Sequence, residues 1–136
     1  MDFMKSLFVA ASGLKAQSGR MRVIAENIAN ADSTGRTPNA DPYRRRIPTF
    51  ESIYDSKMQA SKVELGRIET DRSDFKTRFN PSHPAADVEG FVKMPNVDRL
   101  VEAVDMREAQ RSYEANLNVI SSTRTMLART LDILRA

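Results

Sequence analysis

The C-terminal stretch 96–136 has the apolar spacing of a long amphipathic helix. It contains no glycine and no proline, and its apolar side chains recur every three or four positions. Asn96 is predicted as the N-cap, and Asp98 and Glu102 place acid near the positive end of the helix. A helix of this length would extend about 55–60 Å, whereas a compact chain of this size has a radius of gyration of roughly 14 Å. We therefore expect part of its apolar stripe to pack on another helix, from another subunit.

Residues 1–31 form a second segment with helical periodicity, for which Asp2 is the predicted cap. Its apolar positions follow a heptad seam: Met4, Leu7, Ala11, Leu14, Ser18, Met21, Ala25 and Ile28, widened by Phe3, Ala10, Gln17 and Ile24. Small seam residues bury little apolar area, and Gly13 and Gly19 each cost about 1 kcal/mol of helix propensity. We expect this helix to be marginal alone and stable when packed. Pairing with the C-terminal helix is compatible with packing between subunits, because helices of unequal length leave part of the longer stripe uncovered.

All six prolines lie in the stretch 32–95, between the two helical segments. Turn residues end the first helix at 30–35, and a loop is expected at 37–42. Beyond the loop, the pattern predicts an extended segment at 43–47, then a short helical turn that includes Phe50, Ile53, Tyr54 and Met58. A strand is predicted at 62–68, with Gly66 as a bulge.

These patterns predict a mainly α fold, in which long N- and C-terminal amphipathic helices pair as a coiled coil. We expect an N-terminal helix of the inner domain at 1–31, a central insert of loops and short β elements at 32–95, and a C-terminal helix of the inner domain at 96–136. The side chains predicted to pack between subunits are Leu7, Leu14, Met21, Ile24, Ile28, Val104, Tyr113, Leu117, Ile120, Leu127 and Leu131.

The composition narrows the function classes. Charged residues make up 29% and apolar residues 40% of a chain of 136 residues with a net charge of +3, which is typical of one modest soluble domain. No apolar run approaches the ~18 residues of a transmembrane helix, and the lack of cysteine excludes disulfides and thiolate zinc sites. The apolar run at 7–11 is shorter than the hydrophobic region of a cleaved signal peptide, so we expect any export to use another route.

Few residues are candidates for chemistry. Arg44, Arg45 and Arg46 form a basic run that could bind phosphate, although such runs are more often solvated or ion-paired surface. His83, the only histidine, lies in a turn-rich loop near Asp87 and Glu89, where a solvated histidine is commoner than a metal ligand. The sequence has no nucleophile motif, glycine-rich phosphate loop or calcium-loop spacing. We therefore predict no catalytic, cofactor-binding or metal-binding residues and expect the chain not to be an enzyme.

Two terminal motifs carry a resemblance to a known family. The segment 27–33 reads Asn-Ile-Ala-Asn-Ala-Asp-Ser, and the segment 113–116 reads Tyr-Glu-Ala-Asn. Both resemble motifs in the terminal helices of the axial proteins of the bacterial flagellum, the rod and hook proteins. Gly35 fits the glycine that follows the first motif, whereas Arg36 replaces the aromatic residue usual in hook and distal-rod members. The family-motif residues are Asn27, Asn30, Gly35, Tyr113, Glu114, Ala115 and Asn116.

The central insert narrows this resemblance. The segments 42–46, 80–84 and 90–97 look like the proximal rod members of the family, of the FlgC type. With them, the match covers both termini and most of the insert. The resemblance implies that the terminal helices pair in the inner layer of a tubular assembly, with the insert facing outward.

The resemblance also implies a role. Such proteins form the basal-body rod, which crosses the periplasm and transmits motor torque to the hook and filament. They travel unfolded through the flagellar type III export apparatus without signal cleavage, so the expected partners are that apparatus, other rod proteins and copies of the chain itself. No cofactor, nucleic-acid partner or membrane insertion is expected. The alternatives are a stand-alone helical binding module that uses Arg44–Arg46 on an anionic partner, and a small enzyme.

Overall fold

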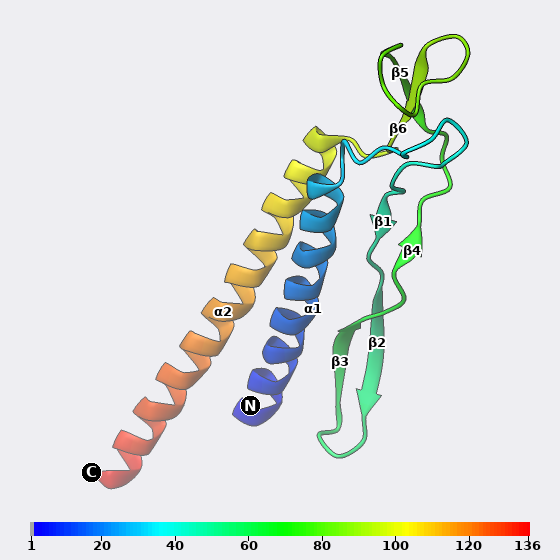
Figure 1. Cartoon of the computed structure of the whole chain (residues 1–136). Helices are drawn as coiled ribbons and strands as arrows, with labels where there is room; N and C mark the ends of the chain where they lie inside the picture. Colours follow the sequence, from blue (N-terminus) through cyan, green and yellow to red (C-terminus); the bar gives the residue numbers. More distant parts are fainter. Residues whose placement is uncertain (1) are drawn as a thin grey trace. The chain divides into compact units, whose positions relative to one another are not determined.

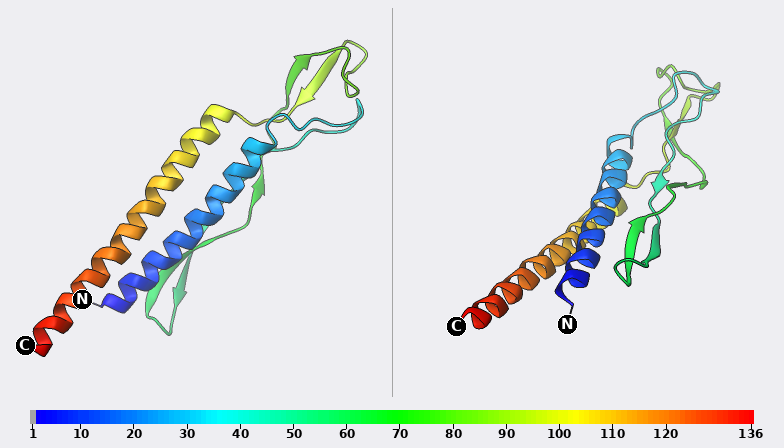
Figure 2. Two further views of the ribbon diagram at one scale, coloured as in Figure 1. Left: turned by 60° about the vertical axis from the view of Figure 1, so that its left-hand side comes forward. Right: turned by 90° about the horizontal axis from the view of Figure 1, so that it is seen from below.

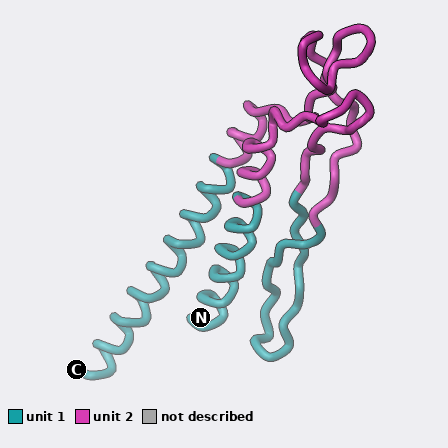
Figure 3. The backbone as a smooth tube through the Cα atoms, in the orientation of Figure 1, with its two compact units in different colours: residues 1–21, 48–67, 107–136 teal, residues 22–47, 68–106 magenta. Residues whose placement is uncertain are grey.

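The computed structural model describes residues 2–136 and contains two long helices separated by six short strands (Figure 1). In chain order the elements are α1 (Phe3–Ala29), β1 (Arg46–Ile47), β2 (Phe50–Asp55), β3 (Ala60–Leu65), β4 (Glu69–Thr70), β5 (Lys76–Phe79), β6 (Phe91–Met94) and α2 (Arg99–Arg135). The chain divides into two compact units (Figure 3): unit 1 comprises residues 1–21, 48–67 and 107–136, and unit 2 comprises residues 22–47 and 68–106.

The strands pair as three antiparallel two-stranded sheets, β1 with β4, β2 with β3, and β5 with β6. Helices hold 47% and strands 18% of the residues, so the fold is mixed α/β and the predicted mainly α class is wrong. The helical turn predicted around Phe50–Met58 is wrong as well, because this stretch contains β2. All but the last residue of β2 are exposed, so the strand lacks the alternation of buried and exposed positions that would have revealed it.

In unit 1, α1 lies between α2 and the β2–β3 hairpin (Figure 2). The position of a Cβ on Gly13 would be 2.7 Å from the Asn116 side chain of α2, and the Ser12 hydroxyl accepts a hydrogen bond from the Val63 amide of β3 at 3.2 Å. From Gly13–Asn116 to the Arg20–Glu108 ion pair at 3.7 Å, the residue number rises along α1 and falls along α2, so the two helices run antiparallel in this unit. Small α1 residues therefore permit close approach on two sides, which explains their frequency in the sequence.

The predicted coiled-coil pairing of the two helices is not shown, and the buried face of α2 explains why. Its buried residues are Glu102, Ala109 and Thr123, with half-buried Asn116 completing a seven-residue spacing. A coiled-coil seam carries apolar side chains at these positions, whereas three of these four are polar. The apolar stripe that the periodicity identified lies largely to the sides of this buried face.

In unit 2, a small core forms on β6, where Val92 and Met94 are buried together with Ala85. Phe91 and Lys93 alternate with them and are exposed, which is the pattern of a strand covered on one side. Gly90 precedes β6 with φ +87°, and a Cβ there would be 2.9 Å from the Phe79 ring. This turn therefore requires glycine.

The helix ends show one confirmed cap and one correction. The Asp2 carboxylate accepts hydrogen bonds from the Met4 and Lys5 amides at 3.1 and 3.2 Å, as predicted for an N-cap. At α2 the cap is Asp98, which accepts from the Leu100 amide at 2.9 Å, so the prediction of Asn96 is wrong. Asparagine and aspartate both cap helices well. Asn96 does not cap α2 because its side chain makes tertiary hydrogen bonds instead.

Candidate functional site

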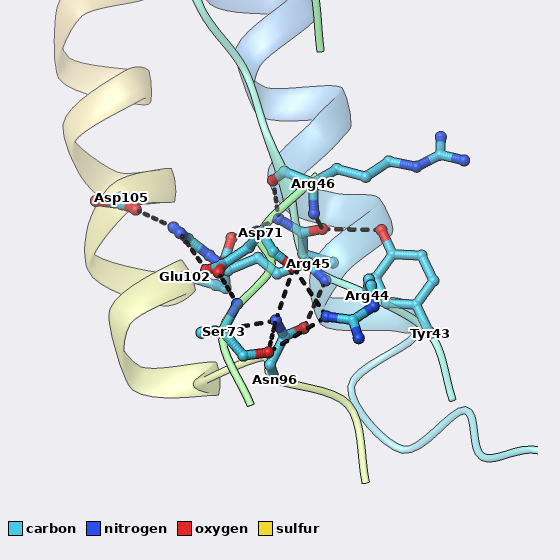
Figure 4. Close-up of polar contacts among 10 residues, drawn as sticks. Tyr43, Arg44, Arg45, Arg46, Asp71, Ser73, Asn96, Glu102 and Asp105 are labelled. Atoms are coloured by element: carbon cyan, nitrogen blue, oxygen red, sulfur yellow. Dashed lines mark hydrogen bonds and ion pairs between the residues drawn. The ribbon is translucent and has the colours of Figure 1, made fainter. Parts of the chain in front are cut away.

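A buried polar cluster in unit 2 joins the end of α1, the segment before β1 and the first turn of α2 (Figure 4). At its centre on α1 is Asn27, which is 1% exposed. Its amide nitrogen donates to the Arg46 carbonyl at 2.8 Å and to Glu102 Oε2 at 3.1 Å. Its amide oxygen accepts from the Tyr43 hydroxyl at 2.8 Å and from the Arg46 amide at 2.9 Å. Every donor and acceptor of the Asn27 side chain is therefore used.

Arg45 neutralises the acidic side of the cluster (Figure 4). Its Nε donates to Glu102 Oε1 at 2.5 Å, and its Nη atoms lie 3.7 Å from Asp71 and 3.5 Å from Asp105. The Glu102 side chain is 1% exposed and that of Arg45 is 23% exposed. The hydrogen bond to Glu102 raises the pKa of the Arg45 guanidinium above its ordinary value. Burial in the same cluster raises the pKa of Tyr43.

Asn96 ties the segment before β1 to the loop after β4. Its oxygen accepts from the Arg45 amide at 2.8 Å, and its nitrogen donates to the carbonyls of Asp71 and Ser73 at 3.1 and 3.3 Å. The Ser73 amide donates to the Asp71 carboxylate at 2.8 Å. This hydrogen bond is the main reason that the pKa of Asp71 lies below its ordinary value, with Arg45 contributing in the same direction.

The three consecutive arginines do not share one basic surface. Arg44 stacks 4.1 Å above the centre of the Phe75 ring and donates to the Ser73 carbonyl at 3.3 Å. Arg45 is engaged by the acids of the cluster, and Arg46 pairs with the exposed Glu26 at 3.3 Å. The structure therefore shows three separately paired side chains where the sequence showed a run of positive charge.

The arrangement holds together parts of the chain that are distant in sequence. Within residues 2–136, no three His, Cys, Asp or Glu side chains are placed to hold a metal ion. His83 Nδ1 accepts from the Ala85 amide at 3.0 Å, and its Nε2 lies 3.3 Å from the Thr34 hydroxyl. No helix in the described part of the chain has the length and apolar content needed to span a membrane.

The side chains predicted to pack between subunits range from buried to exposed. Ile24 is buried. The exposed ones are Val104, Leu117 and Leu131. The half-buried ones are Leu7, Leu14, Met21, Ile28, Tyr113, Ile120 and Leu127.

The family-motif residues lie in both units. Asn27 is the centre of the polar cluster, whereas Asn30 donates to the Glu26 carbonyl at 2.9 Å within the last turn of α1. Gly35 lies where a Cβ would be 2.5 Å from the Ala40 carbonyl oxygen. In unit 1, Asn116 lies against Gly13. Tyr113 is half-buried, and Glu114 and Ala115 are exposed.

Sequence reasoning missed that Arg45, Glu102 and Asn96 form one cluster with Asn27. A signal was present, because Glu102 lies within the apolar stretch of α2 and at a seven-residue spacing from Ala109. A charged residue at such a position predicts a buried partner. The spacing does not reveal that the partner is Arg45, which is 57 residues away.

Comparisons with known proteins agree on one family. Residues 7–35 match the family model described as flagella basal body rod protein, and residues 88–133 match the model for the C-terminal part of the flagellar basal body rod FlgEFG proteins. The chain is 53% identical over 128 residues to the flagellar basal-body rod protein FlgC of Agrobacterium fabrum, covering 94% of this chain and 92% of the relative. It is 40% identical over 148 residues to the FlgC protein of Bacillus subtilis, covering 98% and 99% of the two chains.

Proposed function

Because the chain belongs to the FlgC family of flagellar basal-body rod proteins, we propose that it builds the rod by packing the exposed faces of its two terminal helices against neighbouring subunits. Its role is that of a structural subunit of the rod in the flagellar basal body. The named relatives are structural proteins of that assembly, and none of their names describes an enzyme or a stand-alone binding module.

The observation that carries the packing proposal is the exposed apolar surface of α2. Val119, Met126 and Ile133 recur every seven residues and are 46%, 42% and 76% exposed. Seven residues are close to two helical turns, so these side chains lie along one face of the helix. Exposed apolar side chains aligned on one helix face favour packing against a partner, and burial of the area that each still exposes would contribute about 0.5–2 kcal/mol.

This surface suits a helical tube. A contact between different faces of identical subunits that does not close on itself generates an open helical assembly. Close-packed side chains resist deformation, so many such contacts per subunit would let the rod transmit motor torque across the periplasm. We propose other rod proteins and further copies of this chain as the neighbours.

Export is the second part of the proposal. The chain has no cysteine, and Gly13 and Gly19 weaken α1. A chain without disulfides and with a marginal first helix is suited to passage through the flagellar type III export apparatus in an unfolded state, without signal cleavage. Packing against neighbours would then couple the final ordering of the part of α1 that contains Gly13 and Gly19 to assembly.

The binding-module alternative has no support in the arginine run. Arg44, Arg45 and Arg46 contact Phe75, Glu102 and Glu26 respectively, so binding a polyanion would have to displace contacts already made within unit 2. The family relationship favours the structural role instead.

The packing proposal is tested by Val119→Asp, with Asn118→Asp as the matched control. Both positions are exposed on α2, and both variants introduce the same residue with the same helix propensity. In cells that lack the native protein, we expect Val119→Asp to be exported but absent from purified basal bodies, and the cells not to swim. Asn118→Asp should be incorporated normally. Normal incorporation of Val119→Asp would show that this face of α2 is not a subunit interface.

A further inference from the structure

Glu102 is a buried carboxylate on the face of α2 that meets α1 in unit 2. Its side chain is 1% exposed, and Oε2 accepts from Asn27 of α1 at 3.1 Å. Among residues 2–136, its one ion-pair partner is Arg45, whose Nε is 2.5 Å from Oε1. Removing a carboxylate from water is costly unless a cation and hydrogen bonds compensate it. The burial of Glu102 between the two helices in unit 2 therefore depends on a cation that neither helix supplies.

Arg45 belongs to the segment 43–46, which reaches the helices only by docking against them. Asn27 of α1 binds both the carbonyl and the amide of Arg46, at 2.8 and 2.9 Å. On the other side, Asn96, which precedes α2, accepts from the Arg45 amide at 2.8 Å. The main chain of the segment is thus bound by an asparagine on each side, and this binding delivers the guanidinium to Glu102.

From this arrangement we propose that the segment 43–46 is a latch, and that α1 and α2 close on each other in unit 2 only when Arg45 is docked. Without the segment, closing the helices would bury Glu102 with the Asn27 amide as its one donor in the described contacts. An apolar residue at the Glu102 position would allow the helices to close alone. The buried charge therefore makes helix pairing conditional on the order of the insert. It need not make the pairing more stable than an apolar contact would.

The latch concerns the folding of the single chain and does not depend on the rod role proposed above. It implies that the helix ends 22–29 and 99–106 gain protection together with the segment 43–46 and not before it. The alternative is a local role, in which Arg45 orders its own segment and the helices pair regardless.

Hydrogen exchange measured by mass spectrometry on the full chain separates these possibilities, in a buffer with sulfate to favour the compact state. Arg45→Met leaves Glu102 buried and unpaired. We expect it to speed exchange of the amides in 22–29 and 99–106 by roughly a hundredfold, since breaking a buried pair on one side is strongly destabilising. The double variant Arg45→Met/Glu102→Gln removes the charge and keeps an acceptor for Asn27. It should restore helix protection to near the native level while 43–46 continues to exchange fast.

Arg46→Met is the matched control, because it removes only the exposed contact with Glu26. It should leave the helix amides unchanged. The latch is overturned if Arg45→Met affects only 43–46, if the double variant exchanges as fast as the single one, or if Arg46→Met speeds helix exchange equally. It is also overturned if these helix ends are unprotected in the native chain. Where Arg45→Met does not fold at all, a folded double variant supports the latch and an unfolded one refutes it.

Discussion

Replacing Asn27 by aspartate tests the buried polar cluster of unit 2 by changing one heavy atom of its central side chain. The substitution keeps the oxygen that accepts from Tyr43 and Arg46, and converts the amide nitrogen into an oxygen. In the native protein, that nitrogen donates to the Arg46 carbonyl at 2.8 Å and to Glu102 Oε2 at 3.1 Å. The variant therefore loses two donors and places a second carboxylate beside a buried one.

The expected loss of stability follows from these contacts. An acceptor left without its donor costs about 1–3 kcal/mol where it is buried. Two carboxylate oxygens at about 3 Å would repel by about 5 kcal/mol at an effective dielectric constant of 20. Arg45 offsets part of the repulsion because it already pairs with Glu102. We expect a net destabilisation of about 3–5 kcal/mol at neutral pH.

Urea unfolding followed by circular dichroism at 222 nm measures this change. With a urea dependence of about 1.5–2 kcal/mol per molar, the midpoint should fall by about 2 M. Asn30→Asp is the matched control, because Asn30 also lies in the motif but donates only to the Glu26 carbonyl of its own turn. That variant should lose less than about 1 kcal/mol. Equal losses in the two variants would refute the role assigned to the Asn27 contacts.

Two further predictions concern unit 2. Gly35→Ala should lower the free energy of unfolding, measured by thermal melts, by about 1–3 kcal/mol, since its Cβ would be 2.5 Å from the Ala40 carbonyl oxygen. The control is Gly66→Ala, whose Cβ would meet only side-chain atoms and which should therefore lose less stability in the same melts. A larger loss in Gly66→Ala than in Gly35→Ala would contradict this account. The pKa of Asp71 is lowered chiefly by the Ser73 amide, so its carboxylate stabilises the fold above the unfolded-state pKa of about 3.9 and this contribution is lost as the pH falls through the folded-state pKa. In Asp71→Asn, the urea midpoint should therefore fall less than in the native protein when the pH is lowered below about 3.9. An equal fall in both proteins would contradict a stabilising role of the Asp71 carboxylate.

Some elements were readable from local pattern because a local cause produces them. The two helices follow from apolar spacing, and α1 begins at Asp2 because its side chain caps the first amides. The strand predicted at 62–68 overlaps β3 (Ala60–Leu65), because polar and apolar residues alternate there in the sequence. The strand β2 was misread because it is exposed almost throughout. The cap of α2 was misassigned since Asn96 and Asp98 have similar capping preferences, and only the contacts of Asn96 with the loop after β4 distinguish them.

By itself, the sequence determined the two helices, the irregular character of the stretch between them, and, through its motifs, the rod family to which the chain belongs. Only the tertiary structure decided which face of each helix is buried. Periodicity defines a stripe on a helix but not the neighbour that covers it. Here the cover includes Arg45 for Glu102 and the β2–β3 hairpin for one side of α1, and both come from distant parts of the chain. That is why a glutamate lies in the buried face while Val119 and Ile133 remain exposed.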